Sequence, residues 1–359
     1  MDTSGTNGTS GAAGAAGTAG GAPRKPTRRD VAKLAGVSDA VVSYTLNGGP
    51  PVAAATAERV RAAVAQLGYR PNLSARALRS GSASTLVFLV PSGPDPVFDN
   101  PFFAEYAGTL ESAARERGYA LYTTSSSFEP EHVLARFREF AARQVDGVLV
   151  LASGTPFDRQ ALDQVGLPWV TLNVVTPEPG ADTLGTDLRA GAVATTAHLL
   201  GHGHRSVGFV GEDDPTEPRH VGWLEACAAA GVAPGPFVPA ALTRQGGHDA
   251  GVRIADALRV GDPDAAPAFF IASDRTAIGA LRAFHERRVA VPDDVAIAAF
   301  DGSSDAEYAW PALTSLRQPI EDMARSAVSR VLTPGHDGRH ELFDGHLVVR
   351  ASCGCGHAA

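Results

Sequence analysis

The 359-residue sequence has only three cysteines, Cys227, Cys353 and Cys355. Three cysteines cannot form a disulfide framework, so the fold must rest on a hydrophobic core, for which 44% hydrophobic residues suffice. The sequence also lacks any apolar run of about 18 residues, so we expect no membrane-spanning helix. Its first residues lack a basic stretch followed by an apolar one, so we expect no secretory signal.

Common catalytic signatures are missing as well. The sequence contains no P-loop, no HExxH pair and no nucleophile elbow. We therefore expect neither an enzyme nor a bound cofactor.

Two groups of residues resemble metal ligands, but neither has a strong spacing pattern. His202 and His204 lie in a predicted helix-to-strand turn, and the C-terminal tail carries Cys353, Cys355 and His357. A C-x-C pair alone is weak support for a metal or redox site. Reduced, unpaired thiols are the favoured interpretation, and we expect no metal.

Charge is distributed unevenly along the chain. Residues 1–23 are almost entirely Gly, Ala, Ser and Thr, and we expect them to form a disordered leader. Residues 24–81 hold ten Lys and Arg against three acidic residues, a net charge of +7, whereas residues 82–359 carry −14. A basic segment on an acidic body favours nucleic-acid binding over an ordinary solvated surface.

The basic segment begins with the pattern of two short helices joined by a tight turn. Thr27 is placed to cap a helix over 28–35, and Gly36 allows the turn. Ser38 is placed to cap a second helix over 39–46. Two helices joined in this way form the helix-turn-helix, whose second helix enters the major groove of DNA.

The stretches DVAKLAGVS, VVSYTLN and AERVRAAVAQLGYRPNLSARAL resemble the headpiece of the lactose-repressor (LacI/GalR) family of bacterial transcription regulators. The resemblance continues to about residue 350. It implies an N-terminal all-α helix-turn-helix headpiece with a hinge helix, followed by a two-lobed α/β effector domain like that of periplasmic binding proteins. The expected domain limits are 1–23 for the leader, 24–70 for the headpiece, 71–81 for the hinge, 82–352 for the effector domain and 353–359 for the tail.

By this resemblance the second helix selects bases through Asp39, Ala40 and Tyr44, with Ser43 and Asn47 nearer the DNA backbone. Asp39 either accepts from a cytosine amine or repels phosphate. Many relatives carry Arg at the position of Tyr44, and Tyr cannot grip guanine through two hydrogen bonds as Arg does. We therefore expect an operator that differs from common family operators. The full set of expected DNA contacts is Thr27, Ser38, Asp39, Ala40, Val41, Ser43, Tyr44, Asn47, Asn72, Ala75, Arg76 and Leu78.

The third helix, expected over 56–67, departs from the family pattern. Ala53 and Ala57 stand where relatives usually have a capping Ser and an Arg, which leaves Thr56 as a late cap. The small core of the headpiece is expected to contain Val31, Leu34, Val37, Val42 and Leu46.

The hinge is expected to be a helix over 73–79, capped by Asn72, that is too short to be stable alone in water. In the family this segment folds only on DNA. Leu78 matches the leucine that wedges into the minor groove, and Ala75 and Arg76 match residues that line that groove. A plain linker helix is the alternative.

From Ser84 onward, short apolar runs alternate with amphipathic stretches. We expect strands at STLVFLV, YALYTT, DGVLVLA, LPWVTLN, RSVGFVG, AFFIASD, VAIAAFD and finally LVVRAS. Helices are expected over 103–117, 134–143, 190–200, 221–230 and 277–288. Alternating strands and helices imply parallel sheets, in which ligands bind beyond the C-terminal ends of the strands.

The residues that the resemblance assigns to effector binding lie at or just after predicted strand ends. Phe102 and Phe103 are expected to stack on a sugar or base ring, with core packing as the alternative. Arg219 is expected to grip hydroxyls or a carboxylate, with an ordinary surface arginine as the alternative. Gln318 is expected near the same cleft.

Asp274 and Asp301 are expected to accept hydrogen bonds from ligand hydroxyls, although Asp274 alternatively caps a helix that starts at Thr276. Ser273 and Asn173 stand where many relatives have Asn and Asp. These departures leave three possibilities for the effector, namely an unusual sugar, a nucleoside, or nothing small at all.

The sequence thus predicts a DNA-binding transcriptional regulator, a repressor, that binds a palindromic operator as a homodimer. A sugar-like effector is expected to control it allosterically, in the cytoplasm and without a membrane partner. A solute-binding protein is the first alternative, which the basic headpiece and the missing export signal disfavour. A DNA-binding protein with an enzymatic body is the second, and it would require a catalytic constellation that the sequence lacks.

Overall fold

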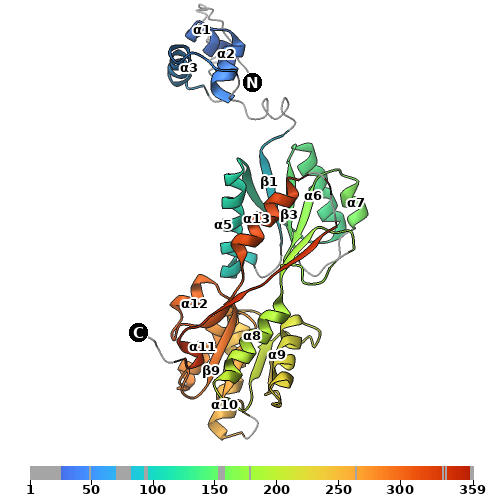
Figure 1. Cartoon of the computed structure of the whole chain (residues 1–359), viewed down its shortest axis with the longest axis vertical. Coiled ribbons are helices and arrows are strands. Elements are labelled where there is room, and N and C mark those ends of the chain that lie inside the picture. Colours follow the sequence, from blue (N-terminus) through green and yellow to red (C-terminus); the bar gives the residue numbers. More distant parts are fainter. Residues whose placement is uncertain are drawn as a thin grey trace, which may run out of the picture. The chain divides into compact units, whose positions relative to one another are not determined.

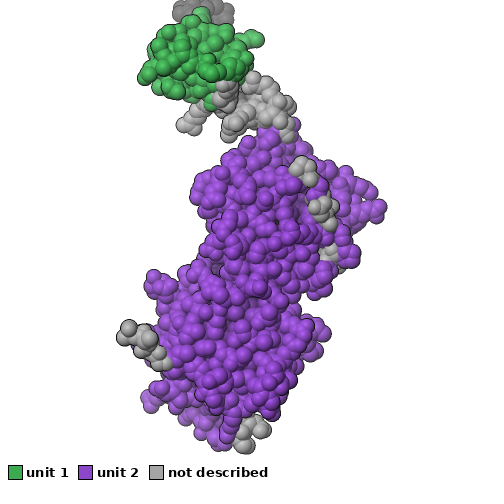
Figure 2. Space-filling model, in the orientation of Figure 1, with its two compact units in different colours: residues 1–76 green, residues 77–359 purple. Residues whose placement is uncertain are grey.

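The structure is a computed structural model of the chain. It describes residues 26–47, 50–69, 82–92, 96–152, 158–177, 179–262, 265–333, 335 and 338–355. The chain divides into two compact units, Met1–Arg76 and Ala77–Ala359, which Figure 2 shows in different colours. The leader expected over 1–23 lies outside the described residues.

The described part of the first unit consists of the helices α1 (Arg28–Ala35), α2 (Asp39–Asn47) and α3 (Ala54–Leu67), labelled in Figure 1. They pack around Val31, Val42 and Val60, whose side chains are completely buried. Gly36, with φ of 65°, makes the left-handed turn between α1 and α2, as the helix-turn-helix pattern predicts.

Side chains cap the first two helices. The Ser38 hydroxyl accepts a hydrogen bond from the backbone N–H of Val41 at 3.3 Å, which confirms the cap expected for α2. At the start of α1, Thr27 donates to the Asp30 carboxylate through its backbone N–H at 2.8 Å and through its hydroxyl at 2.6 Å. The carboxylate therefore ties the chain entering α1 to the first helical turn.

Two expectations for this unit are wrong. The third helix begins at Ala54, so Thr56 lies inside it and does not cap it, and Ala53 supplies no side-chain cap. A run of alanines starts a helix without a cap because alanine has the highest helix propensity. Leu34 is 45% exposed rather than part of the core, because α1 turns Val31 and Ala35 inward instead.

The second unit contains two six-stranded sheets, one in each of two lobes. The first sheet has the strand order β11-β5-β4-β3-β1-β2, and all its pairs are parallel. The second has the order β12-β10-β9-β8-β6-β7, and only its β10–β12 pair is antiparallel. The strands are β1 (Thr85–Pro91), β2 (Ala120–Ser126), β3 (Gly147–Leu151), β4 (Trp169–Leu172), β5 (Thr183–Thr186), β6 (Gly208–Gly211), β7 (Phe237–Pro239), β8 (Ala268–Ile271), β9 (Ala296–Asp301), β10 (Thr314–Arg317), β11 (His340–Phe343) and β12 (His346–Val348).

Helices cover both faces of each sheet. In the described part of this unit the α-helices are α5 (Pro101–Glu116), α6 (Pro130–Ala142), α7 (Arg159–Asp163), α8 (Leu188–Gly201), α9 (Pro218–Ala229), α10 (Arg244–Val260), α11 (Asp274–Arg287), α12 (Ser304–Tyr308) and α13 (Ile320–Val331). Two short 3₁₀ helices are η1 (Val97–Asp99) and η2 (Ala351–Cys353). In the first lobe, α5 and α13 pack on one face of the sheet and α6 and α7 on the other. In the second lobe, α10 and α11 pack opposite α8 and α9.

The chain changes lobe at three described points. It leaves the first lobe after β5 to form α8, returns after β10 to form α13, and leaves again after β11 to form β12. The long red strand segment that runs between the lobes in Figure 1 belongs to the last of these crossings. The two-lobed α/β architecture expected from the sequence is thereby confirmed.

Most predicted helices start later than the observed ones, because capping residues were not counted. The helices α5, α8, α9 and α11 begin two to three residues earlier than expected, since Asn100, Asp187, Glu217 and Ser273 accept hydrogen bonds from their first backbone N–H groups. The strands β5, β7, β10 and β11 and the helices α7, α10, α12 and α13 were not predicted. Among the described residues, no helix is both long and apolar enough to cross a bilayer.

Candidate functional site

The second helix of the first unit exposes two of the three residues predicted to select bases. Ala40 and Tyr44 are exposed on α2, and 42% of Tyr44 is accessible to solvent. Val41 and Ser43 are half-buried between them, and Asn47 is the last residue of the helix. An exposed tyrosine on a recognition helix can contact base edges in two ways, through the apolar face of its ring and through a hydrogen bond of its hydroxyl.

Asp39 has an intramolecular partner that the sequence did not reveal. One carboxylate oxygen accepts from Arg28 Nε at 2.7 Å, and the other accepts from the Arg28 Nη2 amine. The same hydrogen bonds raise the pKa of the Arg28 guanidinium above its usual value. This ion pair joins the first turns of α1 and α2, so a base contact by Asp39 remains a prediction that requires sharing its carboxylate with Arg28.

Other basic side chains of this unit are exposed. They are Arg29, Lys33, Arg59 and Arg61. Exposed cations can approach the phosphates of a DNA duplex closely, so these side chains can attract DNA regardless of its base sequence. Four of the predicted DNA contacts, namely Asn72, Ala75, Arg76 and Leu78, lie outside the described residues together with the rest of the hinge.

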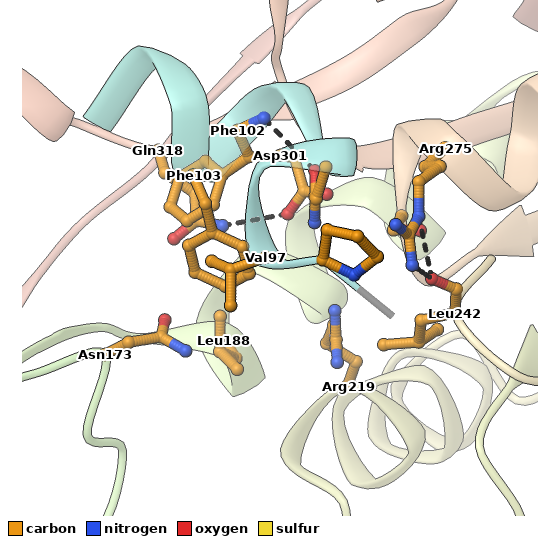
Figure 3. Close-up of a pocket in the computed structure, with 13 residues that line it drawn as sticks. Val97, Phe102, Phe103, Asn173, Leu188, Arg219, Leu242, Arg275, Asp301 and Gln318 are labelled. Carbon is orange, nitrogen blue, oxygen red and sulfur yellow. Dashed lines mark hydrogen bonds between the residues drawn. The ribbon is translucent and has the colours of Figure 1, made fainter. Parts of the chain in front are cut away.

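A pocket of about 290 Å³ lies between the lobes of the second unit (Figure 3). Of the eight residues predicted to bind the effector, all but Asp274 line it. The lining is Pro96, Val97, Asn100, Phe102, Phe103, Asn173, Leu188, Arg219, Leu242, Ser273, Arg275, Asp301 and Gln318. The pocket thus combines apolar rings with charged and amide side chains from both lobes.

The polar lining residues stand where parallel strands end. Asn173 follows β4, Asp301 ends β9 and Gln318 follows β10. The backbone has a positive φ at Asn173 (62°) and at Asp301 (108°), a conformation that non-glycine residues adopt rarely and that concentrates at functional sites. Gly302 continues this corner with φ of 65°, and a Cβ there would lie 2.3 Å from Arg317 Cα. The tight corner aims the Asp301 side chain at the pocket.

Gln318 joins the pocket to the segments that cross between the lobes. Its Nε2 donates to Asp301 Oδ1 at 2.9 Å, and its Oε1 accepts from the Thr186 hydroxyl at 2.7 Å. Thr186 ends β5, just before the chain enters the second lobe, and Gln318 lies just before it returns. A ligand that contacts Gln318 or Asp301 therefore touches two of the crossing segments.

Asp301 is an unusual carboxylate for a binding pocket. Burial, followed by the negative charge of Asp274, raises the pKa of the Asp301 carboxyl far above its ordinary value, although the Arg219 cation and the Gln318 hydrogen bond act in the opposite direction. A carboxyl held neutral can donate a hydrogen bond as well as accept one.

Arg219 is fixed in place on α9. Its Nε donates to the Glu217 carboxylate at 2.7 Å, its Nη1 donates to the Ala272 carbonyl at 2.6 Å, and its guanidinium lies 5.7 Å from the centre of the Phe300 ring. Only 11% of its side chain is exposed. Figure 3 shows this side chain directed toward the pocket from below, so its position is inconsistent with an ordinary surface arginine.

The positions of the two phenylalanines fit both interpretations that the sequence left open, namely core packing and stacking on a ligand ring. Phe102 is buried and belongs to the first-lobe core, yet it also lines the pocket. Phe103 is half-buried, and its ring meets that of Phe102 edge-on at 5.1 Å. Phe103 thus offers a ring face to the pocket, and Phe102 packs behind it.

Asp274 lies behind the pocket rather than in its lining. Its carboxylate accepts from the backbone N–H and hydroxyl of Ser303 at 2.7 and 2.8 Å and from the Ser315 hydroxyl at 2.6 Å. It does not cap a helix at Thr276 either, because α11 starts at Asp274 and the capping hydroxyl belongs to Ser273. Its buried carboxylate braces the loop that follows β9 against β10.

Several lining residues were missed by sequence reasoning. Leu188 opens α8 directly after β5, a four-residue strand that has no long apolar run to reveal it. Arg275 stands two positions after Ser273, and its guanidinium donates to the Leu242 carbonyl through Nε at 3.0 Å (Figure 3). Its position two residues after the strand-end Ser273 is a signal that could have identified Arg275, but it was not used.

Hydrogen bonds beside the pocket connect the lobes. Glu105 on α5 accepts from the backbone N–H and hydroxyl of Ser304 at 2.7 and 2.6 Å. Arg244, the first residue of α10, donates to the Asp99 carbonyl at 3.3 Å. These contacts hold the second lobe against α5 and η1 of the first.

Comparisons with known proteins agree with both parts of the chain. Residues 27–72 match the family model described as bacterial regulatory proteins of the lacI family, and residues 196–353 match a periplasmic binding protein-like domain. The HTH-type transcriptional regulator CelR of Thermobifida fusca is 34% identical over 351 residues, which cover 92% of this chain and 98% of that protein. The HTH-type transcriptional repressor PurR of Photobacterium profundum is 29% identical over 91% of this chain and 98% of its own length.

Solved structures give the same result. A CelR–cellobiose complex aligns with a TM-score of 0.61 and 30% identity, covering 91% of this chain and 99% of that one. A lac repressor dimer bound to operator and the anti-inducer ONPF aligns with a TM-score of 0.73 over 92% of this chain and 99% of that one. At 23% identity, the second alignment shows a shared fold.

Proposed function

The chain belongs to the LacI family of bacterial transcription regulators, and from this premise we propose that it represses transcription by binding an operator under the control of a small polar effector. One observation supports the proposal most strongly. Seven residues that the sequence assigns to an effector converge on one pocket between two lobes, in a chain whose other unit is a helix-turn-helix.

The pocket favours a sugar or a similarly hydroxylated ring compound. Arg219, Asp301, Gln318 and Asn173 supply donors and acceptors, while Phe103 offers a ring face. A volume of about 290 Å³ lies just below the usual range for small-molecule sites, roughly 300–1,000 Å³, which favours a small ligand. The structural relative CelR is solved with cellobiose, which makes short saccharides the first ligands to test.

We propose that the effector acts by changing the orientation of the lobes. Gln318 and Thr186 join the pocket to two crossing segments, so ligand contacts there bias one lobe arrangement over another. In a dimer, a change in lobe orientation alters the separation of the paired hinge segments. The Leu78 side chains then insert together into the minor groove, or fail to do so.

We propose a homodimer because a near-palindromic operator requires two symmetry-related headpieces. The relative solved on its operator is a lac repressor dimer. In this chain, Tyr308, the last residue of α12, and Trp310, two residues later, are 84% and 93% exposed. Such exposure is unusual for large rings, and a partner subunit would bury them.

The remaining features of the proposal follow from this role. A regulator of this kind acts on the chromosome, in the cytoplasm, and binds its effector without converting it. The proposed domain boundaries are those expected from the sequence: residues 24–70 for the headpiece, 71–81 for the hinge and 82–352 for the effector domain.

The proposal is tested in two steps on the full chain. A thermal-shift panel of mono- and disaccharides and nucleosides identifies a ligand, and a selection on random duplexes identifies the preferred DNA. We expect a symmetric preferred sequence and a ligand whose binding is lost in Arg219→Ala. A ligand without any preferred DNA would instead indicate a solute-binding protein, and this result would refute the proposal.

A further inference from the structure

We propose that His198, His202, Cys353 and Cys355 form a Zn²⁺-binding site in the second lobe, separate from the effector pocket. The nitrogen or sulfur ligand atoms of these four side chains all lie within 4.8 Å of one another. None of the four residues lines the pocket. The sequence predicted no metal, because its candidate groups were His202 with His204 and a tail C-x-C with His357. In the structure, His202 instead lies beside both cysteines, and His198 completes the cluster.

The spacing of the ligand atoms fits tetrahedral coordination. Cys353 Sγ lies 3.3 Å from His198 Nε2, and Cys355 Sγ lies 3.7 Å from His198 Nε2 and 3.2 Å from His202 Nε2. Zinc–sulfur and zinc–nitrogen bonds of roughly 2.3 and 2.0 Å at tetrahedral angles separate sulfur from nitrogen by about 3.5 Å. The three observed distances bracket that value, so little movement is needed to seat a metal ion.

Helical geometry and chain topology bring the ligands together. His198 and His202 are four residues apart at the C-terminal end of α8, which places both rings on one side of the helix, with their centres 4.9 Å apart. Cys353 ends η2 and Cys355 lies two residues later, in the segment that follows β12. A pair of imidazoles and a pair of thiols is the donor set that zinc takes in closed structural sites.

The surroundings hold Cys353 in position. Its sulfur is buried and accepts a hydrogen bond from the Thr314 hydroxyl at 3.0 Å. The neighbouring Ser352 hydroxyl accepts from the Thr314 backbone N–H at 2.9 Å and donates to the Ile297 carbonyl at 2.8 Å. Outer contacts of this kind fix the orientation of a metal ligand.

The site would fasten the C-terminal segment to α8. The helix begins with Leu188 in the pocket lining, directly after the first crossing, and the cysteines follow the strand formed after the last crossing. A metal ion here would therefore join the second-lobe ends of two crossing segments and stabilise this lobe. The third cysteine, Cys227, is buried in the same core but is not part of the cluster, which makes it the natural control.

The test uses the full chain, purified with a thiol reductant and without chelator, then incubated with Zn²⁺ and desalted. Elemental analysis should find one zinc per chain, and replacement by Co²⁺ should give thiolate-to-metal charge-transfer absorption. Cys355→Ala and His202→Ala should each weaken zinc binding by more than about 100-fold, the upper loss seen for outer-shell changes alone. These positions are preferred to Cys353, because replacing Cys353 would also remove the hydrogen bond that its sulfur accepts from the Thr314 hydroxyl.

The controls are Cys227→Ala and His204→Ala, which should bind zinc like the unaltered chain. Zinc should raise the melting temperature of the unaltered chain and of both controls, and leave that of Cys355→Ala unchanged. The proposal is overturned if the reduced chain retains no zinc, if Cys355→Ala and His202→Ala bind as tightly as the controls, or if the cysteines form a disulfide and zinc does not bind after reduction.

Discussion

Asp301 shows how much a single residue contributes to the character of the pocket. It combines a positive φ, burial and a hydrogen bond from Gln318, with a second buried carboxylate, Asp274, nearby. Burial raises its pKa, so the folded protein disfavours the ionised form that the unfolded chain adopts above about pH 4. The folded state therefore loses stability as pH rises from there through the raised pKa of Asp301.

Asp301→Asn should consequently stabilise the protein in a pH-dependent way. Asparagine keeps the shape and an acceptor for Gln318 but cannot ionise. The melting temperature of the variant should exceed that of the unaltered chain at about pH 8, and the difference should shrink toward about pH 5. Asp322→Asn, at an exposed position paired with Arg325, provides the control and should show no such trend. An equal shift of the melting temperature at both pH values would contradict the role assigned to burial.

Tyr44 is the residue at which the headpiece departs most clearly from common relatives in its predicted base contacts. Tyr44→Arg should change the half-site preference toward guanine, because a guanidinium can form two hydrogen bonds with that base. Selection on randomised operators measures the change. Tyr122→Arg adds the same charge at an exposed position in β2 and should leave the selected sequences unaltered. If Tyr44→Arg also leaves them unaltered, Tyr44 does not read bases.

Among the helices and strands, the hydrophobic pattern of the sequence located the middle of the longer elements but not the residues at which they begin and end. Long apolar runs such as STLVFLV identified β1 correctly. The strands β5, β7 and β11 have only three or four residues each, too few for a periodic pattern. The helix α10 was missed because RQGGHDAGVRIADALRV contains three glycines, which lower helix propensity, and is stabilised instead by packing against α11.

The location of the pocket was predicted more accurately than the contacts that individual side chains make. Strand ends and a family resemblance located seven lining residues, because parallel strands bring their C-terminal ends to one edge. The resemblance could not show that Asp274 turns away toward Ser303 and Ser315, since that depends on local geometry after β9. The Arg28–Asp39 pair was likewise hidden, because it joins residues eleven positions apart on different helices.

The contact between α5 and the start of α12 should influence the balance between lobe arrangements. Glu105→Ala removes two hydrogen bonds with Ser304, and we expect it to change operator affinity by more than twofold without effector. Fluorescence anisotropy with a labelled operator measures the change. Glu111→Ala on the same helix breaks only an exposed pair with Arg115 and should have no effect. Equal behaviour of the two variants would show that the Glu105 contact does not bias the lobes.

Across the whole molecule, opposite net charges distinguish the DNA-binding segment from the effector domain. The segment over 24–81 has a net charge of +7, and the remainder from residue 82 has −14. Phosphate attraction therefore acts on the headpiece, while the acidic body avoids non-specific contact with DNA. The affinity of the chain for its operator should fall steeply as the salt concentration increases, whereas its affinity for an uncharged sugar should not.

Ligand binding between the lobes is proposed to control the affinity of the headpiece for DNA. The most direct measurement is operator affinity with and without the effector identified by thermal shift, for the unaltered chain and for Arg219→Ala. We predict a change of roughly 5- to 150-fold in the unaltered chain, none in the variant, and the reciprocal change in effector affinity when operator is bound. If an effector binds in the pocket of the unaltered chain and operator affinity stays the same, the pocket does not control DNA binding.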